Sequence, residues 1–270
     1  MRTRGTIPVL LAAAVVLAVM GRGAVAVVHG QGGTGTITGH VKYMGAAPAN
    51  PVIRMGADPR CSKLYVGKRP TSPNVVVAGD GGMANAFLSL EGTFPAAPPP
   101  TTPVVINQQD CMYAPHVVGA RVGQTLQLKN DDETTHNLHS LSMAGNDFNT
   151  SQPMKGMVFE FKLKAGEMLH VKCDIHTWMN AYIGVVDNPY YAVSGADGSF
   201  TISNVPPGRH TIRIWHEVLG PMMQTVEVAA GKTTTLDITY APGQKTAGAD
   251  LGVREWTVPD TAVAELVVLR

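Results

Sequence analysis

The sequence predicts an all-β protein made of two small β-sandwiches. Apolar and polar residues alternate in runs of about four to eight positions, which is typical of strands with one buried face. Breaks rich in glycine and proline separate these runs, and the chain has 29 glycines and 19 prolines among its 270 residues. After the first 30 residues, no stretch shows helical periodicity long enough to predict a helix.

The first 30 residues have the pattern of a secretory signal peptide. Arg2 and Arg4 precede an apolar run over residues 7–20, and small residues at 24–26 offer a cleavage site. The apolar run is shorter than the roughly 20 residues that a membrane-spanning helix needs. We therefore expect residues 1–26 to be removed, no membrane span in the mature chain, and export to the periplasm or the outside of the cell.

The charge of the exported chain gives no sign of a nucleic-acid partner. Residues 1–26 contain three arginines and no acidic residue, so their removal lowers the formal net charge from +1 to −2. Proteins that bind nucleic acids carry a basic patch or stripe, and a near-neutral chain lacks that excess. We expect no nucleic-acid partner.

Residues 33–104 are expected to add β strands to the front of the domain that follows. Alternating runs predict strands over 36–43, 75–78 and 86–90. A proline-rich run over 95–103 predicts a semi-rigid connector. Whether this N-terminal β extension forms a separate module is left open by the pattern.

The most specific chemical pattern lies within residues 105–187. Two predicted strands flank a loop in which His176 lies three residues after Cys173 and three before Met179. His136 lies 37 residues upstream of the cysteine. Regular alternation would point Cys173 and His176 to opposite faces, so the loop must curve and could surround a metal. One thiolate, two imidazoles and a thioether form the donor set of a blue-copper site, although Met and free Cys are also common packing residues.

This loop resembles the copper-binding loop of the cupredoxins, and its Cys-x-x-His-x-x-Met spacing is similar to that of amicyanins. The pair His136–Asn137 is similar to the pattern that carries the first histidine ligand in that family. The resemblance covers residues 105–187 and implies a Greek-key β-sandwich in which Asn137 contacts the ligands. It implies one mononuclear type 1 copper site with four ligands, the last a weak axial one: His136, Cys173, His176 and Met179.

Other histidines near the motif compete for these roles. His139 is the nearest rival of His136, but the asparagine directly after His136 favours the earlier histidine. His116 could be a second metal ligand beside Cys111, although a histidine at a strand edge is the simpler interpretation. His170 precedes the loop on a strand and is expected to be structural.

Soft donors and an enzymatic alternative complete the set of candidates. Met154 and Met157 lie in a polar stretch and could receive Cu(I), since thioethers are soft donors, or could pack over the loop.

A Cys-His hydrolase is the enzymatic rival for Cys173, and it needs a base and an orienting group aligned on the thiolate. The short loop with Met179 fits a metal cage better, so we expect no enzyme.

The three cysteines fit this scheme. An odd cysteine count in an exported protein leaves one thiol that needs an explanation. If copper holds Cys173, then Cys61 and Cys111 are free to form a disulfide. That bridge closes a loop of about 50 residues and would contribute roughly 4 kcal/mol in the chain-entropy model. Two unpaired buried thiols are the alternative.

The segment 188–242 has a second recognisable pattern. It contains Asp197-Gly198-Ser199-Phe200, a hairpin signal, and Asn204-Val205-Pro206-Pro207-Gly208. This pattern resembles the carboxypeptidase regulatory-like modules, which are small prealbumin-like β-sandwiches. Such modules are non-catalytic in their hosts, including as the middle domain of some rhamnogalacturonan lyases, so the resemblance implies no lyase activity.

The end of the chain leaves two interpretations open. Trp215 and His216 follow a predicted strand, and they could dock onto the copper domain or form a capped strand end with a buried tryptophan. Residues 243–270 are expected to be a tail with one or two further strands.

These observations predict a periplasmic or extracellular type 1 copper protein that carries single electrons between redox partner proteins. Asp131, Asp132 and Glu133 could orient such a partner, or could form a solvated loop. One alternative is a Cu(I) carrier or storage module, which would bind Cu(I) tightly without a reversible redox couple. Another is a metal-free structural or carbohydrate-contacting β protein, which would be colourless.

Overall fold

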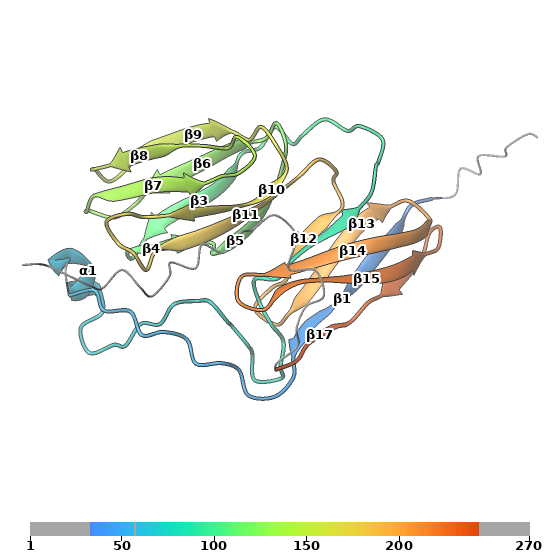
Figure 1. The fold of residues 1–270 in the computed structure, drawn as a ribbon, viewed down its shortest axis with the longest axis horizontal. Helices are drawn as coiled ribbons and strands as arrows, with labels where there is room; N and C mark the ends of the chain where they lie inside the picture. The colour runs from blue at the N-terminus through green and yellow to red at the C-terminus, as the bar shows by residue number, and fades with distance from the viewer. Residues whose placement is uncertain (1–32, 57, 243–270) are drawn as a thin grey trace, which may run out of the picture. The chain divides into compact units, whose positions relative to one another are not determined.

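The computed structural model describes residues 33–56 and 58–242 (Figure 1). The predicted signal peptide over 1–26 and the predicted tail over 243–270 lie outside these residues. Within them, the strands form four sheets, so the predicted all-β class is confirmed. No helix in the described ranges is long and apolar enough to cross a membrane.

Two sheets built from consecutive strands form what we call the first sandwich. Their strand orders are β4-β3-β6-β9 and β5-β11-β10-β7-β8. Both sheets contribute to one hydrophobic core, which includes Leu128, Leu138 and Leu169. The bounds are β3 (Val104–Gln109), β4 (Met112–Ala114), β5 (Val117–Arg121), β6 (Thr125–Asn130), β7 (His136–Leu141), β8 (Asn149–Gln152), β9 (Val158–Lys162), β10 (Glu167–Lys172) and β11 (Asn180–Val186).

Alternation along two of these strands brings the predicted metal donors to the core side. In β7 the buried positions begin at His136 and continue at Leu138. In β10 the buried positions are Leu169 and Val171. Because side chains alternate with period two, Cys173 continues the same side just beyond the strand, and it is only 1% exposed.

The other two sheets form the second sandwich, which combines strands from both ends of the described chain. One sheet has the order β13-β1-β16, with β17 also paired to β1, and the other has the order β12-β2-β14-β15. Their shared core includes Ile37, Leu88 and Ile214. The bounds are β1 (Gly35–Tyr43), β2 (Phe87–Glu91), β12 (Tyr191–Val193), β13 (Ser199–Val205), β14 (Gly208–His216), β15 (Gly220–Val228), β16 (Thr233–Thr235) and β17 (Ile238–Tyr240).

The pairing of β1 and β2 differs from the expectation that residues 33–104 extend the front of the copper domain. β1 pairs antiparallel with β13 and parallel with β16 and β17, while β2 pairs with β12 and β14. The predicted strand over 75–78 is wrong, because only Val77 is bridged, to Met83. An alternating pattern identifies an extended segment but does not identify its distant partner strand.

Residues 44–86 connect β1 to β2, and we call this connection the strap. It contains α1 (Pro59–Leu64), which the sequence analysis missed because six residues are too few for a periodic signal. Asp58 caps this helix by accepting hydrogen bonds from the backbone N–H groups of Arg60 and Cys61. An N-cap aspartate followed by proline is a known helix start signal, and it could have revealed α1.

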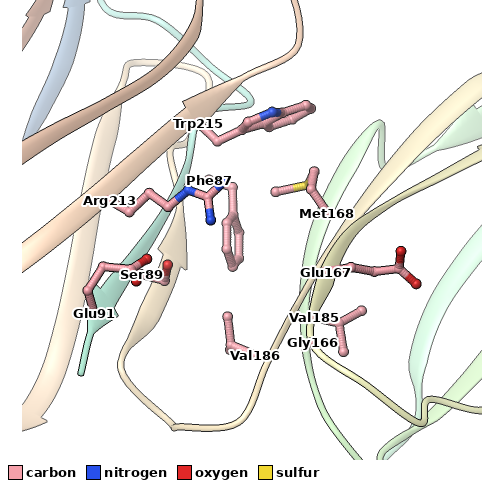
Figure 2. A pocket seen from close by; sticks show the side chains of 10 residues that line it. All are labelled: Phe87, Ser89, Glu91, Gly166, Glu167, Met168, Val185, Val186, Arg213 and Trp215. Carbon is pink, nitrogen blue, oxygen red and sulfur yellow. The ribbon is translucent and has the colours of Figure 1, made fainter. Parts of the chain in front are cut away.

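The two sandwiches meet beside β11. An ideal Cβ at Gly184 of β11 would lie 2.4 Å from the ring of Phe87 in β2, so this contact requires a glycine. Nearby, Met168 of β10 and Trp215 of β14 line the same pocket together with Arg213 (Figure 2).

The tryptophan at the end of β14 takes part in this contact. The ring of Trp215 lies 5.0 Å from that of Tyr182 in β11, so it docks onto the first sandwich. His216 instead points into its own module, where it is buried near Tyr240. Burial lowers the pKa of His216 to about 4, which keeps this imidazole neutral.

The contact at Gly184 gives a stability prediction. We expect Gly184→Ala to lower the free energy of unfolding by about 1–3 kcal/mol, because the added methyl overpacks against a buried ring. Gly79→Ala is the matched control, since no atom lies within 4 Å of the added carbon. Urea unfolding of both variants tests this, and equal stabilities for the two would contradict the close contact at Phe87.

Candidate metal centre

The loop between β10 and β11 is closed by its own backbone. Lys172 and Asn180 are paired at the ends of the two strands, so residues 173–179 form a hairpin loop. The N–H of Cys173 donates to the carbonyl of Met179 at 3.1 Å, and the N–H of Met179 donates to the carbonyl of His176 at 2.8 Å. These bonds curl the loop, so that His176 turns inward and does not follow strand alternation.

Three predicted donors converge in the interior at the end of the first sandwich. Nδ1 of His136 lies 2.9 Å from Nδ1 of His176, and the sulfur of Cys173 lies 3.9 Å from the latter nitrogen. The three donor atoms all lie within 4.8 Å of one another. The side chains are buried, with exposures between 0 and 2%. Met179 is fully buried in the same core cluster as Cys173.

Hydrogen bonds at Cys173 favour its thiolate. The backbone N–H groups of Asn137 and His176 point at the sulfur, at 3.4 and 3.3 Å. Burial alone would raise the pKa of Cys173, but His136, His176 and these two N–H groups lower it to about 6. A sulfur that is already anionic is the form that binds a metal.

Asn137 connects the ligand loop to the neighbouring strands. Its side-chain oxygen accepts a hydrogen bond from the N–H of Asp174 at 3.2 Å. Its amide nitrogen donates to Asn149 Oδ1 at 2.8 Å and to the carbonyl of Thr150 at 3.0 Å. These bonds fix the start of the loop against β8.

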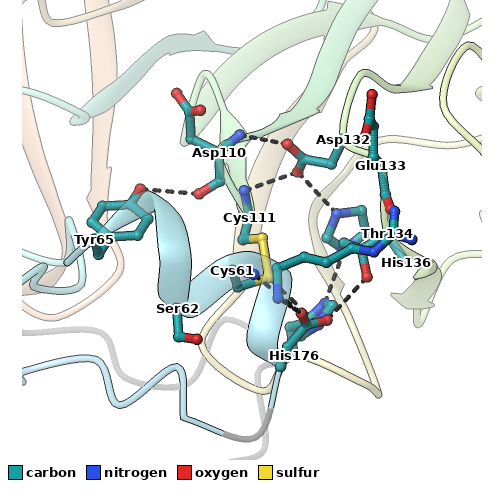
Figure 3. Close-up of a disulfide and its surroundings, with 12 residues drawn as sticks. Cys61, Ser62, Tyr65, Asp110, Cys111, Asp132, Glu133, Thr134, His136 and His176 are labelled. Carbon is teal, nitrogen blue, oxygen red and sulfur yellow. Dashed lines mark hydrogen bonds and ion pairs between the residues drawn. A yellow bond between two sulfur atoms is a disulfide. The ribbon is translucent and has the colours of Figure 1, made fainter.

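Carboxylates hold the outer edges of both imidazoles. Nε2 of His136 donates to Asp132 Oδ2 at 2.9 Å (Figure 3). Nε2 of His176 donates to Asp58 Oδ2 at 2.9 Å. A carboxylate accepts and does not donate, so each Nε2 carries the proton and each Nδ1 presents its lone pair to the interior. Two lone pairs that face each other at 2.9 Å are stabilised by a shared proton or by a metal ion, and two imidazole nitrogens with one thiolate form a donor set that fits a metal.

The electrostatics of the two histidines agree with this arrangement. Burial lowers the pKa of His136, but the hydrogen bond to Asp132 and the sulfur of Cys173 raise it above its ordinary value overall. For His176, burial also lowers the pKa, and Cys173 and Asp58 again raise it overall. The site thus attracts positive charge.

The strap covers His176 and is joined to the first sandwich by a disulfide. Cys61 of α1 and Cys111, in the turn between β3 and β4, form this bond, whose Cys61 sulfur lies 3.8 Å from Nε2 of His176. Trp178 donates from Nε1 to the carbonyl of Cys111 at 2.9 Å, and its ring lies 5.1 Å from that of His176. These contacts leave His176 only 2% exposed.

The competing histidines lie elsewhere. His139 forms an ion pair with Asp174 at the surface. His116 bonds to Glu217 of the second sandwich and to the carbonyl of Asn180. His170 bonds to the side chain of Asn180 at 2.8 Å, as expected of a structural residue.

The candidate methionines also lie outside the cluster of buried donors. Met154 is 65% exposed, and Met157 is partly buried in the same loop. Neither is part of the core cluster that contains Cys173 and Met179.

Two functional candidates were missed or misread from the sequence. Asp132 is 9% exposed and faces His136, so it does not belong with the exposed Asp131 and Glu133 as a possible docking charge. Its position four residues before His136 was the available signal. Asp58 had no signal beyond its cap motif, because it reaches His176 from the strap.

Comparison with protein families identifies part of the chain. Residues 179–241 match the carboxypeptidase regulatory-like domain. The match begins in the ligand loop and includes β11, which pairs within the first sandwich, before it continues through the strands of the second. No curated protein matches the sequence.

Solved structures similar to part of this chain include cupredoxins. A purple cupredoxin from Nitrosopumilus maritimus is 26% identical, with a TM-score of 0.25, and the alignment covers 27% of this chain and 81% of that one. A Cu(I) amicyanin variant is 16% identical, with a TM-score of 0.28, over 36% of this chain and 97% of that one. Another amicyanin variant in its Cu(I) form is 18% identical, with a TM-score of 0.28, over 37% and 98%. Because these TM-scores and identities are low, the function is inferred from the arrangement of the side chains.

The disulfide gives a direct chemical prediction. Non-reducing peptide mapping should recover the Cys61 and Cys111 peptides joined, and the unfolded, unreduced protein should contain one free thiol, because Cys173 is surrounded by histidines. Cys173→Ser is the control, and it should contain none. A bridge that involves Cys173 would contradict both the pairing and the metal site.

Proposed function

We propose that this protein is a type 1 copper protein that transfers single electrons. The observation that supports the proposal is the convergence of one thiolate and two imidazole lone pairs, from Cys173, His136 and His176, on one buried point. Soft sulfur with imidazole nitrogens is the donor set that selects copper for electron transfer. A bound copper ion supplies a one-electron couple between Cu(I) and Cu(II).

The protein's contribution is to hold the donors still. His136 is fixed by β7, and Cys173 is fixed by two backbone N–H bonds and by its position after β10. Met179, the fully buried last residue of the loop, is the candidate for a weak axial ligand. Donors that are held in place by the fold move little when the charge of the metal changes, which favours fast electron exchange.

An enzymatic role for the same residues deserves comparison, since Cys173, His176 and Asp58 together resemble a nucleophile, a base and an orienting carboxylate. Nucleophilic catalysis requires a substrate to reach the sulfur. Cys173 is 1% exposed, and the nearby backbone N–H groups of Asn137 and His176 point at the sulfur itself. They are therefore not placed to stabilise an oxyanion on a substrate. We propose an electron carrier and not an enzyme.

The proposed compartment and partners follow from the sequence and the disulfide. A disulfide persists in oxidising compartments such as the periplasm, and Cys61 and Cys111 are joined. We propose that the protein acts in the periplasm or outside the cell, between a redox protein that donates an electron and another that accepts it.

A Cu(I) carrier is the second candidate. The observation that favours it is the exposure of Met143 and Met154, at 73% and 65%, which would let thioethers meet incoming Cu(I). Reversible voltammetry separates the two functions, because a carrier needs no reversible couple while an electron-transfer protein does. A protein that binds no copper would instead favour the structural alternative.

Addition of Cu(II) should produce an intense visible band. The band arises from charge transfer between the Cys173 sulfur and copper, so Cys173→Ser should abolish it while the β fold is retained by circular dichroism. Titration with Cu(II) followed by absorption spectroscopy measures the band and the stoichiometry, expected to be one copper per chain. A colourless wild-type protein would refute the type 1 assignment.

Substitution of the predicted axial ligand should tune the site without emptying it. Met179→Gln should keep copper bound and lower the reduction potential, because a harder amide oxygen favours Cu(II) and an axial bond is weak. His136→Ala and Cys173→Ala each remove a stronger ligand and should open or empty the site. Voltammetry and copper counts test this ranking. Equal copper loss in Met179→Gln and Cys173→Ala, or an unchanged potential in Met179→Gln, would reject Met179 as the axial ligand.

A further inference from the structure

Asp58 is held in place more firmly than a helix cap requires. Its Oδ1 accepts the backbone N–H groups of Arg60 and Cys61, at 2.7 and 3.1 Å. Its Oδ2 accepts hydrogen bonds from the Thr134 hydroxyl and from Nε2 of His176, both at 2.9 Å. Asp58 thus accepts four hydrogen bonds, and one of them comes from the ring of His176.

Asp132 makes the same arrangement on the other histidine. Its Oδ1 accepts the N–H of Asp110 at 2.8 Å. Its Oδ2 accepts the N–H of Cys111 at 2.8 Å and Nε2 of His136 at 2.9 Å. The two imidazoles thus face the metal position with one nitrogen each and are held by a carboxylate at the other.

The disulfide ties the two carboxylates together. The N–H of Cys61 donates to Asp58, and the N–H of Cys111 donates to Asp132. These two cysteines are covalently joined beside the helix (Figure 3), so the backbone N–H groups that bond to the two carboxylates are linked to each other. A disulfide placed only to close the strap would not need to contact both carboxylates.

We propose that Asp58, supplied by the strap from outside the first sandwich, acts with Asp132 as a pair of positioning residues that favour Cu(II) over Cu(I) and lower the reduction potential. This inference rests on the proposed copper function. A carboxylate that accepts the outer N–H of a histidine ligand fixes the ring and makes its other nitrogen a stronger donor. A stronger donor stabilises the more highly charged Cu(II) more than Cu(I).

Both carboxylates are partly buried, which preserves their electrostatic effect on the two histidines. The side chains of Asp58 and Asp132 are 17% and 10% exposed. Salt and solvent screen partly buried charges much less than exposed ones. Asp174, which lies next to Cys173 in sequence, differs in both respects, because its side chain is 40% exposed and bonds to Lys172 and His139.

Asparagine substitution separates the proposed role from helix capping. Asparagine caps a helix as well as aspartate does, so Asp58→Asn can still accept the N–H groups of α1 through Oδ1. The new side-chain NH2 group at position 58 then faces the Nε2–H of His176. Because both groups are donors, the ring of His176 loses its hydrogen-bond acceptor and the negative charge beside it. Asp132→Asn makes the equivalent change at His136, and Asp174→Asn removes one charge from the loop without touching a ligand ring.

Copper affinities and the reduction potential test the proposal in the full exported protein. In both Asp58→Asn and Asp132→Asn, we expect Cu(II) affinity to fall by roughly 10- to 100-fold, Cu(I) affinity to fall less, and the potential to rise. Asp174→Asn should match the wild type. Competition with chelators gives the affinities, and voltammetry gives the potential. A potential in Asp58→Asn equal to that of Asp174→Asn would overturn the role of Asp58.

A second measurement needs no variant to fold. In the diamagnetic Cu(I) protein, the Nε2–H protons of His136 and His176 should both be protected from solvent exchange in proton NMR spectra. Fast exchange at His176 in the wild type would overturn the proposal. Failure of the copper function is separately visible, because the wild type would then show no visible band with Cu(II). A coloured wild type with an unaltered Asp58→Asn potential refutes only the role of Asp58.

Discussion

The Cys61–Cys111 disulfide is the constraint on which the arrangement of the candidate metal centre depends. It fixes α1 over His176, and its two backbone N–H groups bond to the carboxylates that orient the histidines. A small apolar cluster around the bond includes Ile53 and Met55. Other contacts are polar and near the surface, such as that between the Tyr65 hydroxyl and the carbonyl of Asp110. Covalent closure therefore defines the position of a segment that packing alone holds weakly.

The second sandwich contributes to the candidate metal centre through the strap. The strap leaves β1 after Tyr43 and returns to β2 at Phe87, so both of its ends are fixed in the second sandwich. Phe87 packs against Gly184, and Trp215 contacts Tyr182, which ties that sandwich to β11. The strand that follows the ligand loop is thus also a strand against which the neighbouring module packs.

The sequence could predict features that depend only on residues close together along the chain, such as strands and short loops. Strand alternation identified β1 and β2. The spacing of donors identified Cys173 and His176, because a loop of seven residues brings its own side chains together. It could not predict which strands pair, since β1 finds its partners near the other end of the chain. Asp58 could not be found for the same reason, because nothing local to it records a contact with residue 176.

The position of the strap beside His176 affects how the first sandwich can be separated from its neighbours. A fragment limited to residues 104–187 would contain all four candidate ligands, yet it would lack Asp58 and Cys61. Cys111 would be left as an unpaired thiol close to His136 and Asp132. Transplanting the ligand loop alone into another scaffold would likewise transfer the donors without their outer partners. The residues of this site are therefore joined by hydrogen bonds and a disulfide across the fold. A fragment cut at the ends of the first sandwich does not contain all of them.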